Sequence, residues 1–124
     1  MAKAFLPALI WLVAIIFLST KGGVSVPSFD LLQTDKLAHA AAYALLTGLL
    51  LWGMERQPGT NGIRLIHVLG AILFAFAFGA LMEYVQFRFF PDRMFEYDDM
   101  LANAIGAVAG WGLFVRVSLW LKNR

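Results

Sequence analysis

Four long apolar runs, separated by short polar segments, constrain the fold of this chain more than any other feature of its sequence. The runs cover residues 4–19, 37–54, 65–87 and 100–121. Of all charged residues in the chain, only Glu83 and Arg116 lie inside the runs. A helix needs about 20 apolar residues to cross a bilayer, which the last three runs supply and the first nearly supplies. The pattern predicts an all-α, polytopic membrane protein: a small bundle of four transmembrane helices.

The composition excludes other classes of protein. Charged residues make up 15% of the 124 residues and hydrophobic residues 60%, and there is no cysteine. A typical soluble domain is about 25% charged, and one core of this size cannot bury so much apolar surface. A disulfide scaffold is excluded because it needs cysteines. No basic patch accompanies the net charge of +2, so we expect no nucleic-acid partner.

The first run has two interpretations, because a signal peptide also begins with a basic residue before an apolar stretch. Lys3 precedes the run, but no clean small-residue cleavage site follows it and Trp11 lies in its middle. We therefore expect a retained helix. A turn-forming segment at residues 57–62 separates the second and third runs, and no long linker or repeat occurs, which predicts a single domain over residues 1–124.

The basic residues predict that both termini face the cytoplasm. In that orientation six basic residues lie on the cytoplasmic side and four outside, and the positive-inside rule favours this arrangement. The cytoplasmic six are Lys3, Arg56, Arg64, Arg116, Lys122 and Arg124; the outer four are Lys21, Lys36, Arg88 and Arg93. We expect a multi-pass protein of the cytoplasmic (inner) membrane.

The unusual polar residues lie where three of the expected helices end on one membrane face. Successive spans alternate in direction, so the end of the third run and the starts of the second and fourth share a face. The polar set gathered there is Asp35, Lys36, His39, Tyr43, Glu83, Gln86, Arg93, Asp99 and Asn103. We expect at least three of Asp35, His39, Glu83, Arg93, Asp99 and Asn103 to lie within contact distance of one another.

Helical spacing places these residues on shared faces. Lys36, His39, Tyr43 and Thr47 form one stripe; Glu83 continues the four-residue repeat of Ala71, Ala75 and Gly79; Asp99 and Asn103 continue into Gly106 and Gly110. Small residues let helix backbones approach closely. The two small-residue seams therefore predict helix packing, with Glu83 and Asn103 facing other helices rather than lipid.

Two interpretations of the polar set remain open. In the structural one, Asp98 and Asp99 cap the fourth helix and Asp35 the second, while Gln86 and Asn103 hydrogen-bond between helices. In the functional one, the set forms a pocket at the outer face that holds a lipid headgroup or glycan. An ionisable residue inside a span, such as Glu83, is costly and points to function.

Motifs of known enzymes are absent: there is no Gly-x-Ser-x-Gly, no phosphate-binding loop and no His-Glu-x-x-His. We expect no metal, because His39 has no second histidine at ligand spacing, and no cofactor. Acid–base chemistry by Glu83, Asp99 or His39 stays open.

Three segments of the chain resemble the VanZ-like family of small membrane proteins. They are Asp-Lys-Leu-Ala-His at 35–39 with Tyr43 following, Glu-Tyr-Val-Gln at 83–86, and Arg93 followed by Asp-Met-Leu-Ala-Asn at 99–103 and Gly106-Ala-Val-Ala-Gly110. The chain departs from the family at Ala40, where an aromatic residue often stands. The resemblance implies a multi-spanning fold, a cell-envelope context and a link to glycopeptide (teicoplanin) resistance.

Three functional hypotheses follow. The first is a binding protein for a membrane lipid, in particular an anionic lipid, or for a lipid-linked cell-wall precursor. The second is a membrane enzyme that acts on an envelope lipid or glycan. The third is a scaffold that assembles with another membrane protein, or with further copies of itself, through one of the small-residue seams.

Overall fold

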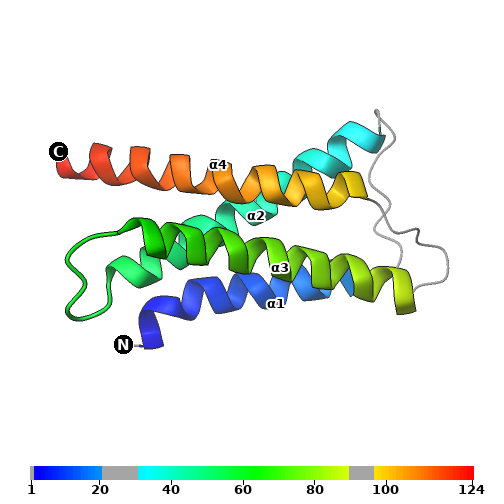
Figure 1. Cartoon of the computed structure of the whole chain (residues 1–124), viewed down its shortest axis with the longest axis horizontal. Helices are drawn as coiled ribbons and strands as arrows, with labels where there is room; N and C mark the ends of the chain where they lie inside the picture. The colour runs from blue at the N-terminus through cyan, green and yellow to red at the C-terminus, as the bar shows by residue number, and fades with distance from the viewer. Residues whose placement is uncertain (1, 21–30, 90–96) are drawn as a thin grey trace.

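The computed structural model describes residues 2–20, 31–89 and 97–124, which fold almost entirely into helices (Figure 1). A short 3-10 helix, η1 (Ala2–Phe5), leads into α1 (Leu6–Thr20); then follow α2 (Leu31–Glu55), α3 (Leu65–Phe89) and α4 (Tyr97–Lys122). None of the described residues forms a strand. Four helical segments are long and apolar enough to cross a membrane, which confirms the predicted all-α fold class.

Two helices begin earlier than the apolar runs that predicted them. α2 begins at Leu31 and α4 at Tyr97, because hydropathy marks only the apolar part of a helix whose first turns are polar. Asp35 thus lies beyond the first turn of α2, and the interpretation that it caps this helix is wrong. Asp98 and Asp99 do lie in the first turn of α4, where a carboxylate opposes the helix dipole.

The closest helix packing joins α2 to α4 and depends on the two glycines of the α4 seam. A Cβ added at Gly106 would lie 2.6 Å from Ala40 Cα, and one at Gly110 would lie 2.9 Å from Ala44 Cα. No real Cβ tolerates such a contact with backbone, so only glycine permits this approach. The α4 seam is therefore used within the chain.

The α3 seam also faces inward, since Ala71, Ala75 and Gly79 are all buried. A scaffold that binds a partner protein would consequently need a surface other than the two seams.

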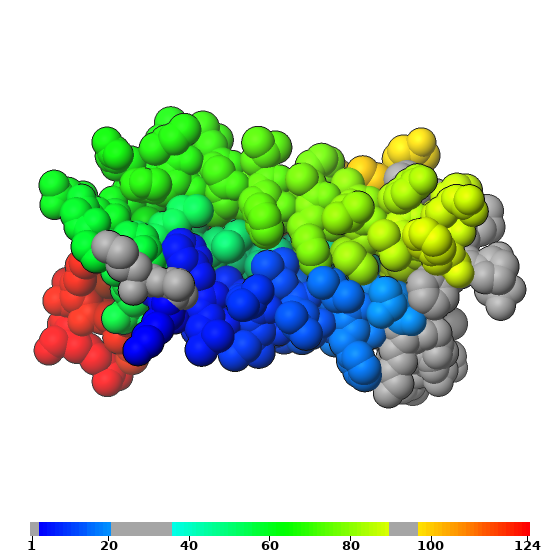
Figure 2. All heavy atoms as spheres, turned by 90° about the horizontal axis from the view of Figure 1, so that it is seen from below, coloured from blue at the N-terminus to red at the C-terminus, as the bar shows by residue number. Residues whose placement is uncertain are grey.

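The first helix packs against α2 and lies beside α3 (Figure 2). The indole Nε1 of Trp11 donates a hydrogen bond to the carbonyl oxygen of Ala42 over 2.8 Å, and the Phe5 ring lies close against Gly53. The opposite face of α1 is apolar and open, with Ile10 61% exposed. Such a face suits contact with lipid chains.

The bundle has two chemically different ends (Figure 1). We call one the basic end: it carries both termini and the turn between α2 and α3, with the basic residues Lys3, Arg56, Arg64, Lys122 and Arg124. The other, the polar end, gathers the end of α3 and the starts of α2 and α4. Which end faces the cytoplasm stays a prediction from the positive-inside rule.

Candidate functional site

Among the residues whose side chains the structure describes, five polar ones are buried in the bundle, contributed by α2, α3 and α4. They are Thr47, Glu83, Gln86, Asp99 and Asn103, each at most 6% exposed. Burying polar and ionisable groups costs free energy unless they find partners. The predicted interior position of Glu83 and Asn103 agrees with this burial, and Gln86 and Asp99 share it.

The three helices meet at a junction around Gly79. A Cβ at Gly79 would lie 2.8 Å from Asn103 Nδ2 and 3.2 Å from Tyr43 Cε1. The absent side chain of Gly79 thus makes room for an amide from α4 and a phenol ring from α2. Glu83 follows Gly79 by one helical turn and is also buried. We call Tyr43, Glu83 and Asn103 the junction residues.

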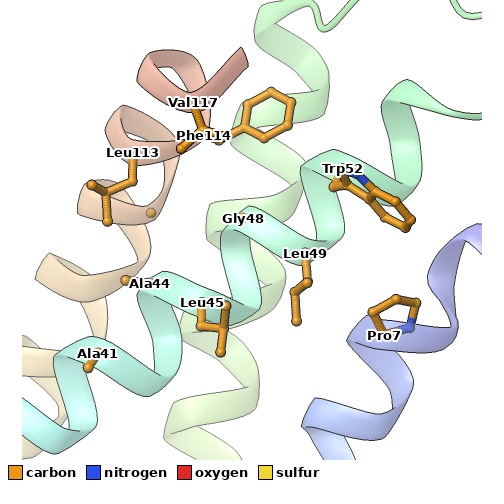
Figure 3. A pocket seen from close by; sticks show the side chains of 11 residues that line it. Pro7, Ala41, Ala44, Leu45, Gly48, Leu49, Trp52, Leu113, Phe114 and Val117 are labelled. Carbon is orange, nitrogen blue, oxygen red and sulfur yellow. The ribbon is translucent and has the colours of Figure 1, made fainter. Parts of the chain in front are cut away.

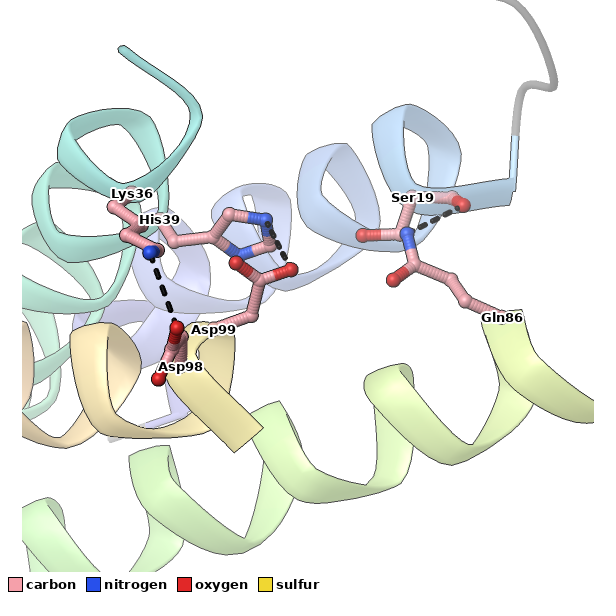
Figure 4. A network of polar contacts seen from close by, with 6 residues as sticks. All are labelled: Ser19, Lys36, His39, Gln86, Asp98 and Asp99. Atoms are coloured by element: carbon pink, nitrogen blue, oxygen red, sulfur yellow. Dashed lines mark hydrogen bonds and ion pairs between the residues drawn. The ribbon is translucent and has the colours of Figure 1, made fainter. Parts of the chain in front are cut away.

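An acid–histidine pair lies toward the polar end from the junction. His39 Nε2 is 3.8 Å from Asp99 Oδ2 (Figure 4), and the two side chains are 19% and 8% exposed. This separation is too long for a strong direct hydrogen bond, but it makes an ion pair when the imidazole is protonated. The pair joins α2 to α4 in a largely buried position.

A second ion pair marks the rim of the polar end. Lys36 Nζ lies 3.3 Å from Asp98 Oδ2, again joining α2 to α4 (Figure 4). The side chains are 34% and 75% exposed, so the pair contributes at most about 1 kcal/mol to stability. Its charged groups are accessible from outside the bundle.

Lys36 and Asp98 also form the charged border of a groove between α2 and α4, which we call the polar groove. Its volume is about 520 Å³. The remaining lining is apolar: Leu37, Ala40, Leu101, Ala102 and Ile105. Charged groups at one border and aliphatic side chains along the walls match an amphiphilic molecule.

Gln86 makes a hydrogen bond between helices, as the structural interpretation of the polar set predicted, and the structure identifies its partner. Its Nε2 donates a hydrogen bond to the carbonyl oxygen of Ser19 over 3.0 Å (Figure 4), which ties α3 to the end of α1. The carbonyl groups in the last turn of a helix have no partner within that helix. The amide of Gln86 satisfies one of them.

Part of the predicted polar set cannot be placed. Arg93 lies outside the described residues, and Asp35 belongs to α2 by its backbone while its side chain lies outside the described ones. The other four members of the expected contact group, His39, Glu83, Asp99 and Asn103, all face the bundle interior or its edge. Of these, the structure brings His39 and Asp99 directly together.

Sequence reasoning predicted a polar pocket at this end but left its details undetermined. It did not pair Lys36 with Asp98, did not give the apolar lining of the polar groove, and gave Thr47, further along α2, no role. Thr47 Oγ1 and Asn103 Oδ1 are buried and have no hydrogen-bond partner among the described residues. Thr47 belonged to the predicted stripe of α2, which was the available signal. Within residues 2–20, 31–89 and 97–124, no group of three or more acidic or histidine side chains is arranged to hold a metal ion.

Comparison with known proteins gives one match. The family model described as VanZ/LLP1 matches residues 4–121, nearly the whole chain. No curated protein and no solved structure matches the chain.

Proposed function

This chain belongs to the VanZ/LLP1 family, and from that premise we propose that it binds the headgroup of a lipid or lipid-linked cell-wall intermediate at the polar end of its bundle. The observation that carries the proposal is the polar groove. Its Lys36–Asp98 border offers charge to a headgroup, and Leu37, Leu101 and Ile105 offer an apolar wall to the attached chain. The proposed site lies at the outer face of the cytoplasmic (inner) membrane.

The charges of the polar end favour one kind of headgroup. Lys36 is a cation suited to a phosphate, whereas Asp98, Asp99 and Glu83 accept hydrogen bonds and repel anions. In the sequence, the segments at this end carry four basic residues and six acidic ones, so a purely anionic lipid meets more repulsion than attraction there. We therefore infer a headgroup that carries hydroxyl or ammonium donors beside its phosphate, as glycosylated and amine-bearing lipids do.

The largely buried residues His39 and Asp99 lie next to Lys36 and Asp98, which form the charged border of the polar groove. His39 follows Lys36 by one turn of α2, and Asp99 follows Asp98 directly in α4. The His39–Asp99 pair thus holds the two helix starts that carry the rim pair. The unfilled acceptor Asn103 Oδ1 lies deeper on the same face of α4 and suits a water-mediated contact.

Native mass spectrometry of the protein purified from its membrane tests this proposal. We expect the wild type to retain a lipid with hydroxyl or ammonium donors in its headgroup at a share well above its share in the bulk membrane. Lys36→Gln should lose about tenfold in retention, since a charge-assisted contact contributes about 1.5 kcal/mol. The matched control is Lys122→Gln at the basic end, which should retain the lipid. Equal lipid profiles for all three proteins, with no enrichment, would contradict the proposal.

A second candidate function rests on the His39–Asp99 pair. A carboxylate beside an imidazole in a largely buried position suits general acid–base catalysis, and the pair adjoins the proposed headgroup site. On this alternative the protein modifies an envelope lipid or glycan. Incubation with envelope lipid extract should then give a new product with the wild type and none with Asp99→Asn. Unchanged lipid in both reactions would count against an enzyme.

The link to glycopeptide resistance is a further part of the proposal. If this protein binds a lipid-linked cell-wall intermediate, less of that intermediate is free to bind a glycopeptide. We expect expression of the wild type, but not of Lys36→Gln, to raise the teicoplanin concentration that inhibits growth. If cells expressing the wild type and cells expressing Lys36→Gln at the same level are equally susceptible to teicoplanin, lipid binding at this site does not confer resistance.

A further inference from the structure

A second groove between α2 and α4, which we call the apolar groove, lies nearer the basic end than the polar groove does, and Figure 3 shows the side chains that line it. Its volume is about 510 Å³. Leu45 and Trp52 line it from α2, and Leu113 and Val117 from α4. The hollow exists because Gly48 faces Gly110 without side chains: a Cβ at Gly48 would meet nothing closer than Gly110 O at 4.0 Å.

One cationic group, Arg56, lies beside a residue that lines this groove, and another, Arg124, lies at the same basic end of the bundle. Trp52, which lines it, has the Arg56 guanidinium 4.3 Å from its ring centroid, and Arg124 lies 3.8 Å from the ring centroid of Trp120. Stacking on an indole holds a guanidinium in place, while its N–H edge remains able to bind a phosphate. Tryptophan is typical of the membrane–water interface, which sets the depth of both arginines at the level of lipid phosphates.

We propose that the apolar groove binds one anionic glycerophospholipid, with an acyl chain along the groove and its phosphate at Arg56, and with Arg124 adding positive charge. The charge balance of this end selects the headgroup. The basic end carries five basic residues besides Arg116 and, in the sequence, a single acidic one, Glu55. This balance is the reverse of that at the polar end, so the two sites take different lipids.

A second copy of the chain is the competing occupant of an apolar groove. Two copies inserted in the same direction would bring two basic ends together, and like charges at one depth repel each other. A phospholipid whose acyl chain lies in the groove brings no such charge repulsion, and its phosphate neutralises the arginines. General attraction of basic residues to an anionic membrane surface needs no groove, so dependence on the groove separates this proposal from it.

Nanodiscs of phosphatidylglycerol and phosphatidylcholine in equal amounts, followed by native mass spectrometry of the released protein, test the proposal. We expect the wild-type chain to retain one phosphatidylglycerol, about thirtyfold preferred over phosphatidylcholine, since two interfacial arginines at about 1 kcal/mol each add about 2 kcal/mol. The double variant Arg56→Gln, Arg124→Gln should lose that preference. Gly48→Leu should fill the groove and lose the retained lipid.

Gly112→Leu is the matched control, because a Cβ at Gly112 meets nothing within 4 Å and the residue does not line the groove. It should retain the lipid. Leu45→Trp fills the groove from its exposed rim if Gly48→Leu reduces helicity. Equal retention in the groove-filling and control variants, no preference in the wild type, or a lipid-free dimer would each overturn the proposal. Lys36→Gln should leave this retention unchanged, so failure here is distinguishable from failure of headgroup binding at the polar end.

Discussion

His39 Nε2 and Asp99 Oδ2 lie 3.8 Å apart and join the start of α2 to the start of α4 inside the bundle. The more exposed Lys36–Asp98 pair joins the same two helices at the rim. Among the residues that the structure describes, the polar end thus contains two pairs of basic and acidic side chains that differ in accessibility. The His39–Asp99 pair joins the two helices inside the bundle, and the Lys36–Asp98 pair is accessible from outside it.

The two pairs should differ in their effect on stability. Asp99→Asn should lower the free energy of unfolding by about 1–3 kcal/mol, because it removes the carboxylate that pairs with His39 in a largely buried position. Asp98→Asn, at an exposed side chain, should cost less than about 1 kcal/mol. Thermal unfolding in one detergent compares them. Equal shifts in the melting temperature would show that burial does not distinguish the pairs.

The glycines of α4 give a prediction about packing. Gly106→Ala and Gly110→Ala place a Cβ against the backbone of Ala40 and Ala44, and should destabilise the protein by about 1–3 kcal/mol. Gly112→Ala meets open space and should be neutral or stabilise by up to about 1 kcal/mol, since alanine favours helix. Urea or thermal unfolding in detergent measures all three. A stable Gly106→Ala variant would contradict the close approach of α2 and α4.

The indole hydrogen bond predicts how firmly the first helix is held. Trp11→Phe keeps an aromatic ring but removes the donor to the Ala42 carbonyl oxygen, and should cost about 0.5–1.5 kcal/mol. Limited proteolysis should then cleave the segment between α1 and α2 faster than in the wild type. Trp120→Phe is the control, because Trp120 is exposed at the far end of α4. Similar cleavage rates for all three proteins would show that the bond does not anchor α1.

The orientation predicted from the basic residues is directly measurable, because the chain has no cysteine of its own. Thr60→Cys places a thiol in the turn between α2 and α3, and Arg88→Cys places one at the end of α3. A maleimide that does not cross membranes should label position 88 and not position 60 in spheroplasts with an intact inner membrane. The reverse labelling pattern would invert the topology and place the polar groove at the cytoplasmic face.

The sequence predicted the helices and their buried faces better than it predicted which residues contact each other between helices. Hydropathy located four spans, and the seams of α3 and α4 placed Glu83 and Asn103 inside. It did not show that Gly106 and Gly110 meet Ala40 and Ala44, or that Lys36 pairs with Asp98. Those contacts depend on how each helix is rotated and crosses its neighbour, which periodicity along one helix does not determine. The two grooves depend on side chains that are small or absent, so no motif marks them.

The most direct test of headgroup binding is photo-crosslinking from within the polar groove. A photoreactive residue in place of Leu101 lies on the groove wall, and one in place of Val108 is an exposed control that lines neither groove. Mass spectrometry should identify one lipid class attached at position 101, with a phosphate and hydroxyl or ammonium donors in its headgroup. That product should disappear with Lys36→Gln, while position 108 yields the bulk mixture. The same bulk mixture at both positions would contradict binding of a specific headgroup at the polar end.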